Sequence, residues 1–361
     1  MAGNRAPTIY DVARRAGVAT STVSRALTRP GRVAAGTVER ITAAAAELGY
    51  RTNPLARALP TGRTSMLALV VGDIACPYTA AMLHGAQTAA GECGFTTVLA
   101  SGSSGSCEGG PFSEGDSGAF SEGDSGAWER ALDTVDGAVV AAPGIPDAAL
   151  LRAAADRPVV LAGRALPGLP GVVPDIPDGL RRLVAHLAVL GHETVTYVAG
   201  PAGTWADGMR RRALRQAGAE CGVQSRAIGP FPATLAGGIA AAGELLRRPS
   251  TAVIAYDDLI AAGLIRALTA RGILVPREIS VAGFGDIAAG ALITPGLTTI
   301  AAPLRLLGDT AVRQLVAVLE GRAVEPLTLP VRLVTRGSTA VPRRMFATAR
   351  PDAMAAAGPF R

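Results

Sequence analysis

The chain contains no lysine, few cysteines and histidines, and few aromatic residues. All 35 of its basic residues are arginine, and aromatic side chains make up 4% of the 361 residues. No Cys-x-x-Cys pair and no zinc-type Cys/His spacing occurs around the four cysteines, which are Cys76, Cys93, Cys107 and Cys221. We therefore expect no disulfide framework, no metal site and no cofactor, and we interpret the cysteines as buried free thiols.

Long hydrophobic runs are also absent. No apolar run is long enough to cross a bilayer, and residues 1–7 lack the charged-then-apolar pattern of a signal segment. We therefore expect a soluble, cytoplasmic protein that makes no membrane contact. Apolar residues nevertheless form 49% of the chain, so sizeable cores can be buried. The length of 361 residues favours two or three domains.

The positive charge is concentrated at one end of the chain. Residues 1–63 hold ten arginines against Asp11, Glu39 and Glu47, which gives a net charge of +7, whereas the remaining 298 residues sum to −1. A basic module on a near-neutral body is typical of a protein that contacts DNA phosphates.

Residues 8–28 have the pattern of a helix-turn-helix. Two short amphipathic helices are joined by a turn that contains Gly17, and the second helix carries small polar groups and one arginine. Thr8 and Asp11 have the spacing of a reciprocal cap on the first helix. A third helix is expected over residues 36–48, and it ends at Gly49.

The remainder of the chain alternates between strand and helix patterns. Repeated alternation predicts doubly wound parallel sheets, with ligand crevices at the carboxyl ends of the strands. A Gly/Ser-rich segment with a duplicated octapeptide interrupts the pattern at 101–127, and we interpret it as a low-complexity insertion. The Ala/Pro-rich tail 341–361 is expected to be disordered. The expected strands are 96–100, 137–141, 159–162, 195–199, 252–255 and 279–284, after an apolar strand at 66–71.

Ordered motifs along residues 8–340 closely resemble those of the LacI/GalR family of bacterial transcriptional repressors. The family's opening pattern stands at Thr8 to Thr28, and its second signature stands at Glu47 to Leu59. Further motifs follow in the body, at residues 186–192, 197–201, 275–281 and 295–300. So many motifs in order make the resemblance specific, unlike a lone helix-turn-helix.

The resemblance implies an α/β fold with an N-terminal helix-turn-helix head. The body would resemble a periplasmic sugar-binding protein, with two Rossmann-like doubly wound subdomains and an effector in the cleft between them. We expect a DNA-binding domain at 1–50, a hinge helix and linker at 51–64, and an effector-binding and dimerisation domain at 65–340. The expected subdomains are 65–163 with 290–322, and 164–289 with 323–340.

The resemblance also assigns residues to DNA. Thr20, Ser21 and Arg25 would contact base edges in the major groove, where an arginine can pair with guanine. Phosphate contacts would come from Tyr10, Thr22 and Ser24. The hinge segment 53–59 would fold on the operator and place Leu59 as an apolar wedge in the minor groove, with Ala56 as its neighbour and Asn53 as a further DNA-binding residue. The alternative is that Arg25 is a solvated surface residue and that Leu59 packs on the body.

Effector-site residues are carried over by position. Arg210 matches the arginine that clamps ligand oxygens, and Asp257 matches a cleft acid. The other matching positions in or near the cleft are Asp73, Tyr78, Trp205 and Phe231. A structural ion pair or a core aromatic residue is the alternative for each of them.

Three positions depart from the family pattern. Tyr256 stands where an asparagine is usual, Gly285 where a carboxylate is usual, and Ile176 where a second asparagine is usual. Each change removes a polar group that could hydrogen-bond a sugar. The effector is therefore either a less polar molecule or one to which the response is weakened.

The leading hypothesis is a ligand-responsive repressor that is controlled by a sugar or sugar-like effector and binds a pseudo-palindromic operator as a homodimer. An activator and a tetramer remain alternatives, although residues 343–361 contain no leucine and so no leucine heptad. A solute-binding protein would not need the basic head. An enzyme is not expected, because the chain has no dinucleotide fingerprint, phosphate-binding loop or nucleophile elbow, and so no catalytic residue is assigned.

Overall fold

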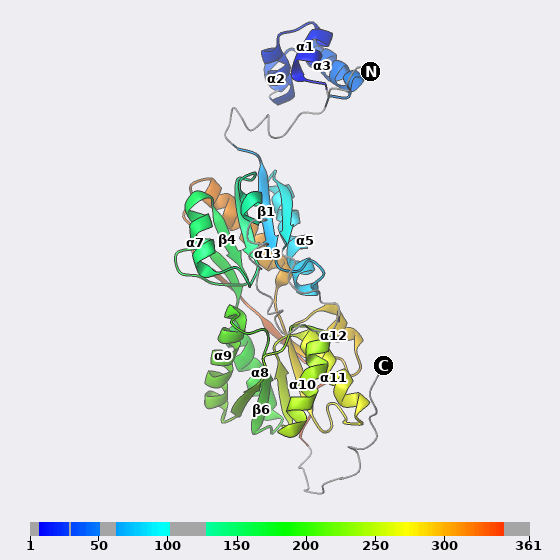
Figure 1. The fold of residues 1–361 in the computed structure, drawn as a ribbon, viewed down its shortest axis with the longest axis vertical. Coiled ribbons are helices and arrows are strands. Elements are labelled where there is room, and N and C mark those ends of the chain that lie inside the picture. Colours follow the sequence, from blue (N-terminus) through cyan, green and yellow to red (C-terminus); the bar gives the residue numbers. More distant parts are fainter. Residues whose placement is uncertain (1–6, 29, 51–62, 102–127, 343–361) are drawn as a thin grey trace. The chain divides into compact units, whose positions relative to one another are not determined.

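The computed structural model describes residues 7–28, 30–50, 63–101 and 128–342. The chain divides into two compact units, a head within residues 1–64 and a body within residues 65–361 (Figure 1). The expected hinge segment 53–59, nearly all of the insertion 101–127 and the tail beyond residue 342 lie outside the described residues.

Within its described residues, 7–28, 30–50 and 63–64, the head is a bundle of three helices. It consists of α1 (Ile9–Ala16), α2 (Thr20–Thr28), a 3₁₀ turn (Pro30–Arg32) and α3 (Ala35–Leu48). Val12, Val23 and Ile41, one from each helix, are fully buried at its centre. Gly17 ends α1 with φ +68° and Gly49 ends α3 with φ +64°, a conformation that glycine adopts without strain. The expected helix-turn-helix and third helix are confirmed.

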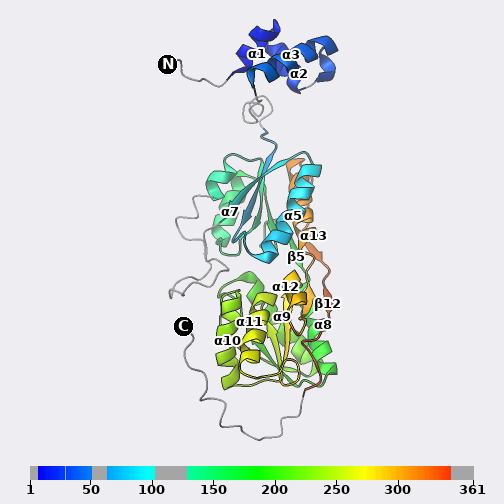
Figure 2. The same ribbon diagram turned by 90° about the vertical axis from the view of Figure 1, so that its right-hand side faces the viewer.

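The first sheet of the body is entirely parallel. Its strand order is β11-β5-β4-β3-β1-β2. Helices α5 (Pro77–Glu92) and α13 (Leu304–Leu319) cover one face, and α7 (Asp147–Asp156) lies on the other (Figure 2). The strands are β1 (Met66–Val71), β2 (Thr96–Ser101), β3 (Gly137–Ala141), β4 (Val159–Ala162), β5 (Gly171–Pro174) and β11 (Leu327–Leu329).

The second sheet has the order β12-β10-β9-β8-β6-β7, and only β12 runs antiparallel to its neighbour. Helices α8 (Ile176–Val189) and α9 (Trp205–Cys221) cover one face, and α10 (Leu235–Arg247) and α11 (Asp258–Ala270) cover the other. A short helix, α12 (Ala288–Leu292), follows β9. The strands are β6 (Thr194–Val198), β7 (Gln224–Ile228), β8 (Ala252–Ala255), β9 (Ser280–Gly285), β10 (Thr298–Ala301) and β12 (Arg332–Val334).

The two α/β subdomains that the resemblance implies are confirmed, but the strand pairing moves their boundaries. β5 (Gly171–Pro174) and β11 (Leu327–Leu329) pair in the first sheet, although 164–289 and 323–340 were expected in the second subdomain. β10 (Thr298–Ala301) pairs in the second sheet, although 290–322 was expected in the first. Short strands at a crossover carry too few residues for their pattern to reveal which sheet they join. Among the described residues, no helix is long and apolar enough to cross a membrane.

Helices α5 and α13 approach each other through glycine. A Cβ atom built on Gly85 of α5 would lie 1.9 Å from the carbonyl oxygen of Arg305, and one built on Gly308 of α13 would lie 2.0 Å from the carbonyl oxygen of Met82. Backbone atoms cannot move aside as a flexible side chain can. The two helices can therefore pack at this distance only because both positions lack a side chain.

We predict that Gly85→Ala lowers the free energy of unfolding of the body by about 1–3 kcal/mol, because the added methyl group overpacks a backbone contact. Gly91→Ala, in the same helix but with nothing within 4 Å of its Cβ position, is the matched control. It should leave stability unchanged or raise it by up to about 1 kcal/mol through helix propensity. Denaturant unfolding of the full chain measures both, and equal effects of the two substitutions would contradict the packing described.

Candidate functional site

The first turn of the head is fixed by a reciprocal cap. The Oδ2 atom of Asp11 accepts hydrogen bonds from the backbone nitrogen of Thr8 at 2.9 Å and from its Oγ1 at 2.7 Å. The backbone nitrogen of Asp11 in turn donates to the carbonyl oxygen of Thr8 at 3.0 Å. These bonds satisfy groups that a helix start leaves open.

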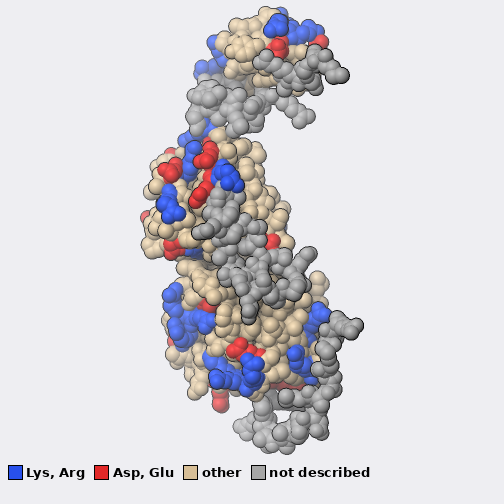
Figure 3. Space-filling view, viewed as in Figure 1, with Lys and Arg blue, Asp and Glu red and all other residues tan. Residues whose placement is uncertain are grey.

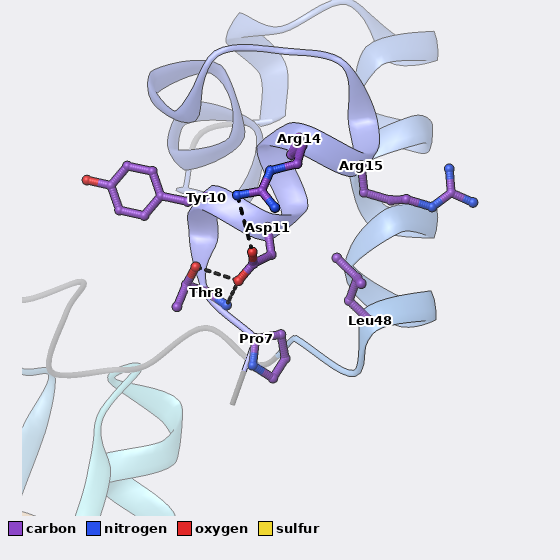
Figure 4. Close-up of a pocket in the computed structure, with 7 residues that line it drawn as sticks. All are labelled: Pro7, Thr8, Tyr10, Asp11, Arg14, Arg15 and Leu48. Carbon is purple, nitrogen blue, oxygen red and sulfur yellow. Dashed lines mark hydrogen bonds and ion pairs between the residues drawn. The ribbon is translucent and has the colours of Figure 1, made fainter. Parts of the chain in front are cut away.

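An open hollow lies between the start of α1 and the end of α3, and Figure 4 shows the residues that line it. Tyr10 points away from the bundle and is 67% exposed. On the other side, Arg15 forms an ion pair with Glu47 of α3 at 2.7 Å. Arginine side chains are visible on the surface of the head in Figure 3. The lining residues are Pro7, Thr8, Tyr10, Asp11, Arg14, Arg15 and Leu48.

Helix α2 divides into a buried face and a polar face. Val23 and Ala26 are buried against α1 and α3. Ser21, Ser24 and Arg25 are exposed, and Thr20 and Thr22 are half-buried. The residues that the sequence assigns to DNA on this helix therefore share its outer side, with Arg25 in the last turn. This is the arrangement that a helix needs in order to enter a groove while its other face holds the domain together.

In the body, the guanidinium group of Arg210 is enclosed by aromatic rings. Its central carbon lies 4.1 Å from the centre of the Tyr256 ring and 4.2 Å from that of Phe284, and the residue is only 9% exposed. Among the described residues, neither Nε nor Nη1 of Arg210 has a hydrogen-bond acceptor. The rings offset part of the cost of burying the charge, but these two donors remain unsatisfied.

Two consecutive acids stand at the end of β8, beside this arginine. Asp257 is the N-cap of α11, and its Oδ1 accepts a hydrogen bond from the backbone nitrogen of Ile260 at 2.8 Å. Burial raises the pKa of Asp257 to about 6. Asp258 accepts from Thr299 Oγ1 at 2.5 Å and from the backbone nitrogen of Ile287 at 2.9 Å. Its pKa is also raised by burial.

Tyr78 reaches this cluster from the first subdomain. It lies in the first turn of α5, and its hydroxyl accepts a hydrogen bond from the backbone nitrogen of Asp258 at 2.7 Å. The same hydroxyl donates to the carbonyl oxygen of Phe284 at 3.3 Å. Burial raises the pKa of Tyr78 well above its ordinary value, so the hydroxyl keeps its proton.

The remaining predicted effector residues differ in their surroundings. Asp73 follows β1, and its Oδ1 accepts a hydrogen bond from the backbone nitrogen of Ala75 in its own loop at 2.8 Å. Trp205 begins α9 and packs on the core of one face of the second sheet. Phe231 packs on the core of the opposite face. The structure thus brings Arg210, Asp257 and Tyr78 together, whereas Trp205 and Phe231 belong to separate layers.

Sequence reasoning assigned no role to Phe284 or Asp258. Phe284 supplies one of the two rings on Arg210, and Asp258 orients Tyr78 through its backbone nitrogen. Phe284 lies near the carboxyl end of β9, and Asp258 follows the carboxyl end of the neighbouring strand β8. Ligand crevices of a parallel sheet form at this edge, so this position in the sequence could have indicated both residues. The departure Ile176 is buried at the start of α8 in the core of the second subdomain, where a polar side chain would find an apolar surrounding.

We predict a specific pH dependence for Asp257→Asn. Because burial raises the pKa of this carboxyl from 3.8 to about 6, the folded state holds a proton that the unfolded state has lost between these pH values. The stability contributed by protonated Asp257 is therefore present below pH 3.8 and is lost as the pH rises through 6. Asparagine retains an oxygen that can cap α11 but does not titrate.

Relative to pH 4, the difference in free energy of unfolding between Asp257→Asn and the wild type should shift in favour of the variant by up to about 3 kcal/mol at pH 7. Urea unfolding of both proteins across this range measures it. A difference that stays constant with pH would show that Asp257 ionises as an exposed acid does.

Comparison with known proteins gives matches over both units. Residues 8–53 match the family model described as "Bacterial regulatory proteins, lacI family", and residues 184–339 match one described as "Periplasmic binding protein-like domain". The transcriptional regulator DegA of Bacillus subtilis is 31% identical over 345 residues, which span 92% of this chain and 98% of that protein.

Solved structures agree with this assignment. A lac repressor dimer bound to operator and the anti-inducer ONPF matches with a TM-score of 0.81 and 27% identity, over 93% of this chain and 100% of that one. A complex of the regulator CelR with cellobiose matches with a TM-score of 0.64 and 29% identity, over 92% and 99%. These relatives are regulators rather than enzymes. The chain belongs to the LacI family of bacterial transcriptional regulators.

Proposed function

We propose that this regulator binds a specific operator through α2 and that an effector in the body controls its affinity for that operator, so that it acts as a repressor. The observation that carries the proposal is the polar outer face of α2 on a basic head, with Arg25 exposed in its last turn. A groove-binding helix needs such a face, and a purely structural helix does not.

Each residue on this face has a role that its chemistry supports. Arg25 would donate to a guanine, and Thr20 and Ser21 would contact neighbouring base edges through a hydroxyl or a methyl group. Tyr10, exposed on α1, would hydrogen-bond to a phosphate together with Thr22 and Ser24 of α2. In the segment outside the described residues, Asn53, Ala56 and Leu59 would enter the minor groove.

The unsatisfied nitrogens of Arg210 support a ligand in the body. A buried guanidinium gains most from a ligand that brings oxygen acceptors to Nε and Nη1, as a carbohydrate does. The similar regulator CelR has been solved as a complex with cellobiose. We propose a sugar or sugar-like effector, bounded by Tyr78, Asp257 and Arg210, with Asp73, Trp205 and Phe231 farther along the walls.

The regulator would act as a cytoplasmic homodimer on a pseudo-palindromic operator and would carry out no catalysis. A two-fold dimer presents two heads to two half-sites, which matches the symmetry of such operators. The lac repressor structure to which the chain is similar is itself a dimer on its operator.

The test of this function is selection of bound sequences from a pool of random duplex DNA by the full-length chain. Enrichment of a two-fold symmetric site is expected, and the affinity of that site should then change when members of a carbohydrate panel are added. Failure to enrich any sequence would contradict the DNA-binding function. Enrichment without an effect of any carbohydrate would contradict the sugar effector alone.

We predict that Arg25→Ala weakens binding to the selected site by about 1–3 kcal/mol and relaxes preference at one base pair of each half-site. Arg40→Ala, which removes an exposed arginine from α3, is the matched control for charge. It should weaken binding to all sequences by a similar factor and leave preference unchanged. Fluorescence anisotropy on the selected site and its single-base variants separates the two, and unchanged preference in Arg25→Ala would contradict base contact.

A further inference from the structure

The ring of Tyr78 fills the space in front of Gly285. A Cβ atom built on Gly285 would lie 2.1 Å from Cε1 of Tyr78, 3.0 Å from Cδ1 and 3.1 Å from Cζ. The distance of 2.1 Å is too short for any real contact between a Cβ atom and a ring, and the other two are tighter than most such contacts. The position of the Tyr78 ring therefore requires that residue 285 have no side chain.

The hydroxyl of Tyr78 is held as firmly as its ring. It accepts from the nitrogen of Asp258 and donates to the carbonyl oxygen of Phe284, so both of its hydrogen-bonding functions are used. Tyr78 belongs to α5 of the first subdomain, whereas both partners belong to the second. The Tyr78 side chain thus joins the two subdomains through the hydrogen bonds of its hydroxyl and through the contact of its ring edge with Gly285.

This contact lies in the proposed effector site and not in a remote part of the core. Phe284 is shared, because its carbonyl oxygen accepts from Tyr78 while its ring stacks on Arg210. Gly285 is the next residue, at the position where the family pattern has a carboxylate. A carboxylate side chain at residue 285 and the Tyr78 ring in its present position would therefore exclude each other.

We propose that Tyr78 is a tethered occupant of the effector cleft, which fills the part next to Gly285 and joins the subdomains through Asp258 and Phe284. The proposed effector would then bind beside Arg210. The pair Tyr78 and Gly285 selects a small ligand that offers acceptors to Nε and Nη1 and places no group at residue 285. The role in effector choice rests on the proposed function, but the occupancy itself does not.

A double-mutant cycle tests the occupancy in the full-length protein. Gly285 has φ +132°, so any side chain there strains the backbone whether or not Tyr78 is present. Comparing Gly285→Ala in the wild type and in Tyr78→Ala cancels this strain and leaves the clash with the ring. We expect Gly285→Ala to lower the Tm by about 5 °C more when Tyr78 is present.

Tyr78→Phe separates the ring from the hydroxyl. It keeps the atoms that clash with residue 285, so its coupling to Gly285→Ala should match that of the wild type. Its own Tm should fall, because the nitrogen of Asp258 loses its hydrogen-bond acceptor. Equal effects of Gly285→Ala in the wild type and in Tyr78→Ala would overturn the proposal.

Chemical rescue gives a second test that does not depend on folding of the Gly285 variant. p-Cresol has the shape and hydroxyl of the tyrosine side chain, and it should raise the Tm of Tyr78→Ala but not that of the wild type. Toluene lacks the hydroxyl and should raise it less. The absence of any selective effect of p-cresol would overturn the occupancy. Failure of operator binding would instead refute the proposed function and leave both of these tests unaffected.

Discussion

The charge of Arg210 is the constraint on which the buried cluster at the carboxyl ends of β8 and β9 depends. A cation 91% removed from solvent must be stabilised locally, and here two aromatic faces provide part of that stabilisation. The two neighbouring acids are hydrogen-bonded to other groups: Asp257 caps α11, and Asp258 accepts from Thr299 Oγ1 and from the backbone nitrogen of Ile287. The site therefore retains two arginine donors without an acceptor among the described residues, and the proposed effector would supply acceptors to them.

Regulation requires that the effector bind two arrangements of the body with different affinity, because equal affinity shifts no equilibrium. The cleft has suitable components for such a difference. Arg210, Tyr256 and Phe284 belong to the second subdomain, whereas Tyr78 enters from the first. The proposed ligand beside Arg210 would therefore change the environment of the Tyr78 hydroxyl, which links the two subdomains through Asp258 and Phe284. Phe284 takes part in both sets of contacts, because its ring lies on Arg210 and its carbonyl oxygen accepts from Tyr78.

The sequence predicted the elements well and their contacts less well. Apolar runs such as 66–71, and glycines such as Gly17 and Gly49, act locally, so their consequences can be inferred without a structure. Gly285 was interpreted as a loss of polarity, because the residue that needs the space lies 207 positions away in the chain. The pairing of Phe284 with Arg210 has the same cause. Pattern analysis reports which residues reach the edge of a sheet, but not which of them meet across a cleft.

The glycine contact between α5 and α13 has a mechanical consequence for the cleft. Helices whose backbones touch at Gly85 and Gly308 have no layer of side chains that could deform between them. Tyr78 lies two turns before Gly85 on the same helix, so its phenol cannot be withdrawn by sliding α5 alone. We therefore expect α5 and α13 to move together whenever Tyr78 leaves the second subdomain. A shift of the Tyr78 phenol relative to Asp258 and Phe284 would then be accompanied by a shift of α13.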